Sequence, residues 1–198
     1  MSVAIHPKSL NGPWDGGYAL DLHTLSSTPI GYDSYGHMQF DTEYSAVGGL
    51  LYRLKSKGDP SVVPELVDAI GSFWALSPRP SIDCIVPVPA TKQRKCPPVL
   101  LVATALSERM GIPLCVDCIA KVKQTAQLKD LVEYDKRMEA LEGAFTVDSG
   151  RTEGKDILLF DDLYRSGATV SVITNLLKKD GRAKAVRLLT LTRTRSKS

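Results

Sequence analysis

The chain has 198 residues, a length typical of one α/β domain that can bury a sizeable core. Its 43% hydrophobic and 24% charged residues exclude wholesale disorder. The net charge of +3 is too small to indicate a polyanion partner by itself. The charge is uneven, however, because eight basic residues from Lys178 to the end stand against one acid, Asp180, and leave the rest mildly acidic.

Membrane and export signals are not visible in the sequence. No stretch approaches the roughly 20 apolar residues of a spanning helix, and the amino end lacks the pattern of a secretory signal. We therefore expect a cytoplasmic protein without a membrane partner. Cys115 and Cys118 form a CxxC, which suggests a redox pair or half of a zinc site, but no second CxxC accompanies it. We expect the cysteines to be reduced, small core residues.

The first part of the chain predicts a small antiparallel flap and then a helix. Residues up to about 11 are expected to be loose. Alternating apolar and polar residues over 18–22 predict a strand, which a turn-rich run connects to a second strand at 37–41 in a hairpin. Asp59-Pro60-Ser61 then opens a helix with apolar residues at helical spacing, and Pro78 and Pro80 end it.

Strands and helices alternate in the rest of the chain. Strands are expected over 82–86, 114–119, 157–160 and 185–191, and helices over 98–110 and 169–179, with a weaker helical pattern within 121–141. This alternation predicts an α/β fold with a mostly parallel sheet and helices on both faces. The basic residues around the last strand, at 182, 184 and 187, are expected to be solvated, so the true basic tail is Arg193, Arg195 and Lys197.

The segment from Ile157 to Val170 carries the most specific pattern. Asp161 and Asp162 follow an apolar strand, at the edge where open α/β sheets place ligands. Ser166 to Thr169 then open a helix whose amino end favours a phosphate, and Gly167 permits close approach or a positive φ. Two acids suit such a ligand if it also presents vicinal hydroxyls, as ribose 5-phosphate does. A solvated acid pair or a magnesium-binding pair is the alternative.

This segment resembles the phosphoribosyl-pyrophosphate (PRPP) signature of type I phosphoribosyltransferases. The resemblance implies the fold of that family, with Asp161 and Asp162 on the ribose hydroxyls. It implies that the 5-phosphate contacts Arg165, Ser166, Gly167, Ala168 and Thr169. It also implies Mg²⁺ bound through PRPP, with help from the two acids and no dedicated protein site, and it assigns no catalytic residue.

Two further segments resemble the ComF branch of that family. Pro87-Val88-Pro89 precedes a basic loop, which implies pyrophosphate contacts for Ala90, Thr91, Lys92, Arg94 and Lys95; a solvated polar loop is the alternative. The residues from Lys121 to Gln127, a later Arg, and Gly143-Ala144-Phe145 resemble the family's mobile flap, with candidates Lys121, Lys123, Gln127 and Arg137. The chain departs from ComF proteins at Cys96-Pro97-Pro98-Val99, where Arg-Gly-Phe-Asn is common. No cysteine precedes Cys84, so no zinc is expected.

The resemblance implies a hood over residues 1–58 and a phosphoribosyltransferase-like core over 59–198. Such an enzyme transfers the phosphoribosyl group of PRPP to a nitrogen of an unidentified base or amine and releases pyrophosphate. The hood aromatics either stack on that base or pack on the domain below; they are Tyr18, Tyr32, Tyr35 and Phe40, with His23 as a further candidate. His23 and His37 are otherwise expected to be surface or hairpin residues.

Two alternatives stay open at this point. The altered loop near Cys96 suggests a non-catalytic sensor of PRPP or nucleotides. The ComF resemblance suggests an interaction protein for DNA uptake, although three tail charges are too few to indicate nucleic acid. A homodimer is a further expectation.

Overall fold

The computed structural model describes residues 3–76, 81–90, 96–123 and 134–195. Strands and helices follow one another in this order: β1 (Lys8–Ser9), β2 (Gly17–Leu22), β3 (Thr24–Tyr32), β4 (Met38–Tyr44), α1 (Ala46–Tyr52), η1 (Arg53–Lys57), η2 (Pro60–Val62), α2 (Val63–Leu76), β5 (Cys84–Pro87), α3 (Pro98–Met110), β6 (Ile119–Lys121), α4 (Tyr134–Leu141), β7 (Phe145–Val147), α5 (Ser149–Thr152), β8 (Asp156–Tyr164), α6 (Ala168–Lys179) and β9 (Ala185–Arg193).

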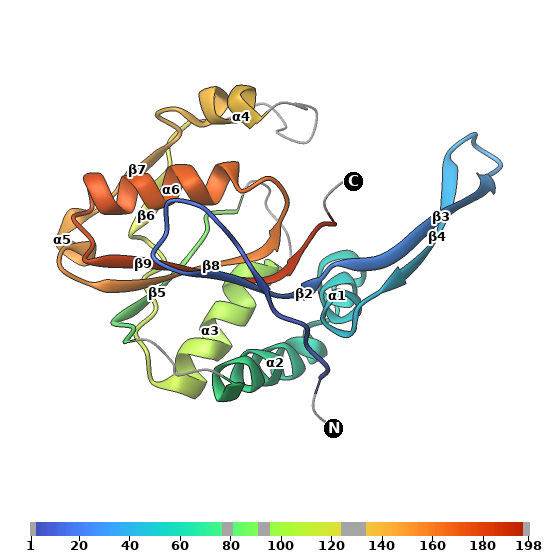
Figure 1. Cartoon of the computed structure of the whole chain (residues 1–198), viewed down its shortest axis with the longest axis horizontal. Helices are drawn as coiled ribbons and strands as arrows, with labels where there is room; N and C mark the ends of the chain where they lie inside the picture. The colour runs from blue at the N-terminus through green and yellow to red at the C-terminus, as the bar shows by residue number, and fades with distance from the viewer. Residues whose placement is uncertain (1–2, 77–80, 91–95, 124–133, 196–198) are drawn as a thin grey trace.

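A five-stranded sheet with the order β1-β2-β9-β8-β5 forms the centre of the molecule. Strands β2, β9, β8 and β5 are mutually parallel, and β1 pairs with β2 in the antiparallel sense. Helices α4 and α6 lie on one side of this sheet and α1, α2 and α3 on the other (Figure 1). The predicted α/β class, with a mostly parallel sheet between two helical layers, is confirmed.

Strand β8 has neighbours on both edges and a core on each face. Ile157 and Leu159 belong to the core under α6, while Leu158 and Phe160 belong to the core under α1, α2 and α3. Burial on both faces explains its unbroken apolar run. The strand extends four residues beyond the expected 157–160, because its pairing with β9 continues to Tyr164 opposite Arg193. The acid pair therefore lies within the paired end of the strand.

The amino-terminal segment differs from the prediction. Residues 8–9 pair with 18–19, and Leu10 and Trp14 are buried, so this segment is not loose. Strand β2 joins the central sheet beside β9, because Ala19 and Leu20 each reach a different core. The expected hairpin exists, but its arms are β3 and β4, and it projects from the body of the molecule (Figure 1).

Helix α1 and the π-helix η1 were not expected from the sequence, because two adjacent glycines are unfavourable in a helix. Ser45 caps α1 by accepting a hydrogen bond from the Gly48 backbone N–H at 2.9 Å. A side chain at Gly48 would collide with the His23 carbonyl. Glycine at this position therefore lets α1 pack closely against the end of β2.

The expected strand over 114–119 is wrong. Leu114 forms only an isolated bridge with Ile85, and the chain then turns before β6 begins at Ile119. Cys115 and Cys118 are joined by a disulfide across this turn. The expectation of reduced cysteines is therefore wrong for this pair, whereas Cys84 and Cys96 are free thiols.

Three basic residues near the last strand are ion-paired; Arg182 and Lys184 have exposed side chains, as expected, whereas Arg187 is partly buried. Lys184 and Arg187 both reach the Asp156 carboxylate, at 2.9 Å and 3.3 Å. Arg182 pairs with Glu153 at 3.0 Å. Within the described ranges, none of the helices combines the length and the apolar character needed to cross a membrane.

Candidate functional site

The acid pair lies at the carboxyl end of β8, where the ends of the parallel strands meet. The Asp161 carboxylate accepts a hydrogen bond from the Asp162 backbone N–H at 2.9 Å, which fixes its orientation. Asp162 is buried and forms an ion pair with Lys55, whose Nζ lies 2.7 Å from Oδ2. Lys55 comes from η1, 107 residues earlier in the chain.

Electrostatics distinguishes this pair from ordinary surface acids. The protein packed around the carboxyl group raises the pKa of Asp161 to about 8, and the neighbouring Asp162 charge adds to this rise. Lys55 acts in the opposite direction. Burial, followed by the Lys55 charge, lowers the pKa of His23 on the adjoining strand end. Two acids, a lysine and a histidine thus influence one another at this edge.

The loop after β8 has the geometry of an anion-binding turn. Gly167 adopts φ +80° at the N-cap of α6, a conformation that side chains other than glycine rarely adopt. A Cβ atom there would also lie 2.5 Å from the Tyr164 hydroxyl oxygen. Gly167 contributes no side chain to cap α6, and the Ser166 hydroxyl reaches the Ala168 N–H only at 3.5 Å. The first N–H groups of α6 therefore point toward a position suited to an anion.

Strand β5 ends at the same edge of the sheet. Pro87 pairs with Phe160, and the Val88 N–H donates to the Phe160 carbonyl at 2.9 Å. Ala90 follows as an exposed residue. Thr91, Lys92, Arg94 and Lys95 lie outside the described residues, and their role stays a prediction.

The two flap candidates whose side chains the structure describes lie at the small sheet of β6 and β7. Lys121 ends β6, which pairs with β7 in a two-stranded sheet, and Lys123 follows as an exposed residue. Gln127 lies outside the described residues. Arg137 lies on α4, but its side chain is outside what the structure describes. The flap role of these four residues stays a prediction.

The aromatic residues of the amino-terminal region divide into two groups. Tyr18 packs against Phe73 of α2, with ring centroids 5.2 Å apart, as expected for a residue that covers the domain. Tyr32, Tyr35 and Phe40 are exposed on the projecting hairpin. The hairpin group is the more exposed of the two, although 44% of Tyr18 is also exposed.

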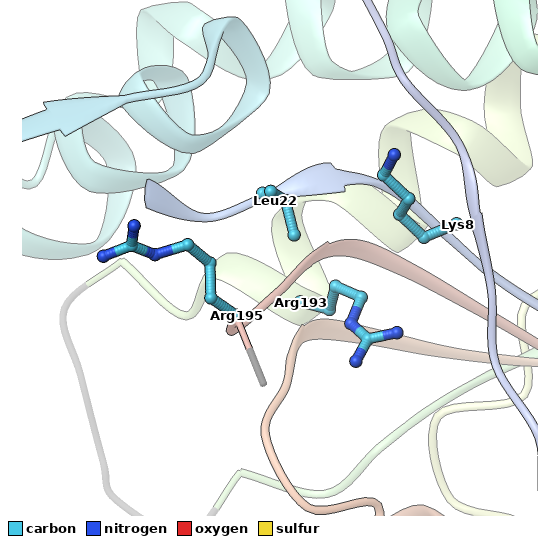
Figure 2. A pocket seen from close by; sticks show the side chains of 4 residues that line it. All are labelled: Lys8, Leu22, Arg193 and Arg195. Carbon is cyan, nitrogen blue, oxygen red and sulfur yellow. The ribbon is translucent and has the colours of Figure 1, made fainter. Parts of the chain in front are cut away.

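A basic pocket lies one strand away from the acid pair, at the ends of β2 and β9 (Figure 2). It has a volume of about 320 Å³ and is lined by Lys8, Leu22, Arg193 and Arg195. Arg193 lies opposite both Leu22 of β2 and Tyr164 of β8 in the sheet. Arg195 also donates to the Leu25 carbonyl at 2.8 Å, which ties the chain end to the base of the hairpin. The carboxyl edge of the sheet thus carries negative charge on β8 beside positive charge on β9.

Lys55 lies at the candidate site and was not predicted from the sequence, whereas His23 was named only as a candidate to stack on the base or as a surface residue. His23 was expected at the surface of a hairpin, but it is partly buried, and its Nδ1 lies 3.3 Å from the Thr192 hydroxyl. Lys55 lies in a basic run with Arg53 and Lys57, which is indistinguishable from a solvated turn by sequence alone. The one usable signal was that this run follows an apolar segment and ends at Gly58.

The donor atoms at this edge suit a magnesium ion that arrives with phosphates. Mg²⁺ commonly uses one or two protein carboxylates and takes its other ligands from substrate phosphates and water. Asp161 and Asp162 supply such carboxylates, although Lys55 already pairs with one oxygen of Asp162. Among the described residues, no cluster of three or more His, Cys, Asp or Glu side chains is arranged to hold a metal ion.

Comparison with known proteins returned structural likenesses only. No family model matches the chain, and no curated protein does. Adenine phosphoribosyltransferase from Saccharomyces cerevisiae, in complex with an imino-altritol bisphosphate and adenine, is 13% identical with a TM-score of 0.47 and covers 85% of this chain and 84% of its own. The Trypanosoma brucei enzyme, in complex with AMP, pyrophosphate and ribose-5-phosphate, is 12% identical with a TM-score of 0.47, covering 95% and 87%. Leishmania donovani UMP synthase is 16% identical with a TM-score of 0.41, covering 84% of this chain and 27% of its own.

Proposed function

We propose that this protein binds PRPP with Mg²⁺ and transfers its phosphoribosyl group to a nitrogen nucleophile, releasing pyrophosphate. The observation that carries the proposal is the acid pair at the end of β8 followed by Gly167 at positive φ opening α6. One ligand that would use both the acid pair and the turn before α6 is a sugar with two hydroxyls a few ångströms from a phosphate. A ribose 5-phosphate unit has this layout.

Each half of the site has a distinct task in this proposal. Asp161 and Asp162 hold the ribose hydroxyls through charge-assisted hydrogen bonds, each contributing roughly 1.5–3 kcal/mol. Residues 165–169 hold the 5-phosphate with backbone N–H groups and the positive end of the α6 dipole. Together they fix the ribose so that its anomeric carbon faces the loop after β5.

The reaction displaces pyrophosphate from the anomeric carbon of PRPP, and the transition state carries positive charge on the ribose ring. The diphosphate leaves with negative charge, which Mg²⁺ and the side chains of Lys92, Arg94 and Lys95 would stabilise. The acceptor approaches from the amino-terminal side, where the hairpin bears Tyr32, Tyr35 and Phe40.

Pyrophosphate release tests this function. The purified chain is incubated with PRPP, Mg²⁺ and a panel of purine, pyrimidine and simple amine acceptors, and pyrophosphate is measured with a coupled assay. Release that depends on one acceptor supports the transferase. PRPP binding without release across the panel favours the sensor instead, and absence of PRPP binding contradicts both. The control is Asp117→Asn, which removes an exposed acid remote from β8.

A further inference from the structure

We infer that Lys55 is a positioning residue of the PRPP site: it holds Asp162 in place and makes the acid pair compatible with a highly anionic ligand. This inference rests on the proposed function and assigns a role to a residue outside every motif recognised in the sequence. It follows from the placement of η1, from the contacts of its three cations and from the charges around the acid pair.

The three basic side chains of η1 contact different groups. Arg53 pairs with Asp59 at 2.7 Å, next to its own helix, and the Lys57 ammonium lies 5.7 Å from the centroid of the Tyr52 ring. Lys55 alone of these three crosses to the sheet, where it meets Asp162. Its side chain is 28% exposed and that of Asp162 is 11% exposed, so the pair is largely removed from water.

Stability alone is a poor explanation for this ion pair. Removing two charges from water opposes their attraction, and apolar residues of similar size often serve a partly buried position as well. The pair is, moreover, at the sheet edge where ligands bind in open α/β folds. An ion pair at that place is better explained by what it does for a ligand.

The positive charge of Lys55 explains how the ion pair can help a ligand to bind. An acid pair that carries negative charge repels a ligand with three phosphate groups' worth of negative charge, even if its oxygens suit the ligand's hydroxyls. The Lys55 charge acts on Asp162 directly, and its field also reaches Asp161 and His23. Arg165 is the other cation whose field reaches His23 at this edge. Lys55 thus offsets one acidic charge while leaving the second oxygen of Asp162 available to a hydroxyl.

The backbone around η1 supports a fixed position for Lys55. The π-helix ends at Gly58 in the left-handed conformation, with φ +66°. The Cys96 thiol lies 3.7 Å from the Gly58 carbonyl oxygen, next to the start of α3. The element that carries Lys55 is therefore joined to the segment that follows the predicted pyrophosphate loop.

The test is a calorimetric titration of PRPP with Mg²⁺ into the wild type, Lys55→Gln, Lys55→Arg and the matched control Lys57→Gln, repeated at several salt concentrations. Glutamine removes the charge and keeps a hydrogen-bond donor on a slightly shorter side chain. We expect Lys55→Gln to bind about 10-fold more weakly, with a shallower salt dependence than wild type. Lys55→Arg is expected within about 3-fold of wild type, and Lys57→Gln within about 2-fold.

The outcomes separate this inference from the proposed function. A wild type that binds PRPP, together with an unchanged affinity in Lys55→Gln, overturns the role of Lys55 and leaves the function standing. A weaker Lys55→Gln whose salt dependence equals that of wild type, and which Lys55→Arg does not restore, also overturns it. A wild type that binds no PRPP overturns the proposed function and the ligand assigned to Lys55 with it. Lys55→Met replaces the glutamine variant if urea unfolding shows that the latter does not fold.

Discussion

The two ends of strand β8 both carry aspartates with little solvent exposure, and their charges are balanced in different ways. At the amino end, Asp156 accepts hydrogen bonds from Lys184 and Arg187, and the Lys184 bond is the main cause of its lowered pKa. At the carboxyl end, Asp162 pairs with Lys55, and burial together with the Asp162 charge raises the pKa of Asp161.

This difference distinguishes a carboxylate held by ion pairs within the fold from a pair of acids in which one pKa is strongly raised. At the amino end, the Asp156 carboxylate has two cationic partners, as expected where the fold itself needs the charge. At the carboxyl end, the described residues show one ion pair, between Asp162 and Lys55, and groups with strongly shifted pKa values gather at sites that bind or react. Of the basic residues near the chain end, Lys184 and Arg187 pair with Asp156 at the amino end of β8. Arg193 and Arg195 line the pocket at the carboxyl edge.

The largest effect is expected from a side chain at Gly167. Gly167→Ala places a Cβ against the Tyr164 hydroxyl and strains a backbone with φ +80°. We expect PRPP affinity to fall about 100-fold or more, because the phosphate-binding turn must open, with a loss of about 1–2 kcal/mol in stability. Calorimetry and urea unfolding measure the two effects.

Gly36→Ala is the matched control for that variant. Gly36 has φ +79°, almost the same backbone conformation, but a Cβ there meets nothing within 4 Å. It should show the same backbone strain with PRPP affinity unchanged. Equal affinity in the Gly167 and Gly36 variants contradicts the phosphate role of residues 165–169.

The pH dependence of stability should have opposite signs at the two ends. Because the pKa of Asp161 is raised to about 8, the folded chain keeps a proton that the unfolded chain loses, so this group's contribution to stability falls as pH rises from about 4 to about 8. The pKa of Asp156 is lowered, so its contribution is present above its ordinary value of 3.8 and is lost as pH falls below it.

Urea unfolding between pH 3 and pH 8.5 tests these signs by difference from wild type. Asp161→Asn should gain stability relative to wild type as pH rises toward 8. Asp156→Asn should be less stable than wild type at neutral pH, and this difference in the free energy of unfolding should shrink as pH falls toward 3. A difference curve for Asp161→Asn that is flat from pH 4 to 8.5 contradicts the raised pKa.

Local patterns in the sequence predicted the core of the fold. The apolar runs of β8 and β9, the Pro-opened helices α2 and α3, and the Gly167 turn each follow from neighbouring residues. Pairing across long distances did not: β2 has the alternation of a hairpin strand, yet burial of Ala19 and Leu20 on opposite faces assigns it to the central sheet. Helix α1 was not predicted because glycine disfavours a helix. Gly48 is nevertheless suited to its position, because a side chain there would collide with the His23 carbonyl after β2.

The candidate site shows the same division. Asp161, Asp162 and the turn that follows are contiguous, so one segment of sequence revealed them. Lys55 and His23 join them only through the fold, and neither stands in a pattern of its own. Ion pairs form between residues that the fold brings together in space. The different ion pairs at the two ends of β8 were therefore not visible in the sequence.

The most direct test of the central claim is a calorimetric titration of PRPP with Mg²⁺ into wild type, the double variant Asp161→Asn/Asp162→Asn and Asp156→Asn. The account predicts binding by wild type and by folded Asp156→Asn, and no measurable binding by the double variant, whose circular dichroism spectrum should match that of wild type. Unchanged PRPP affinity in the double variant would contradict the assignment of the ribose site to the carboxyl end of β8.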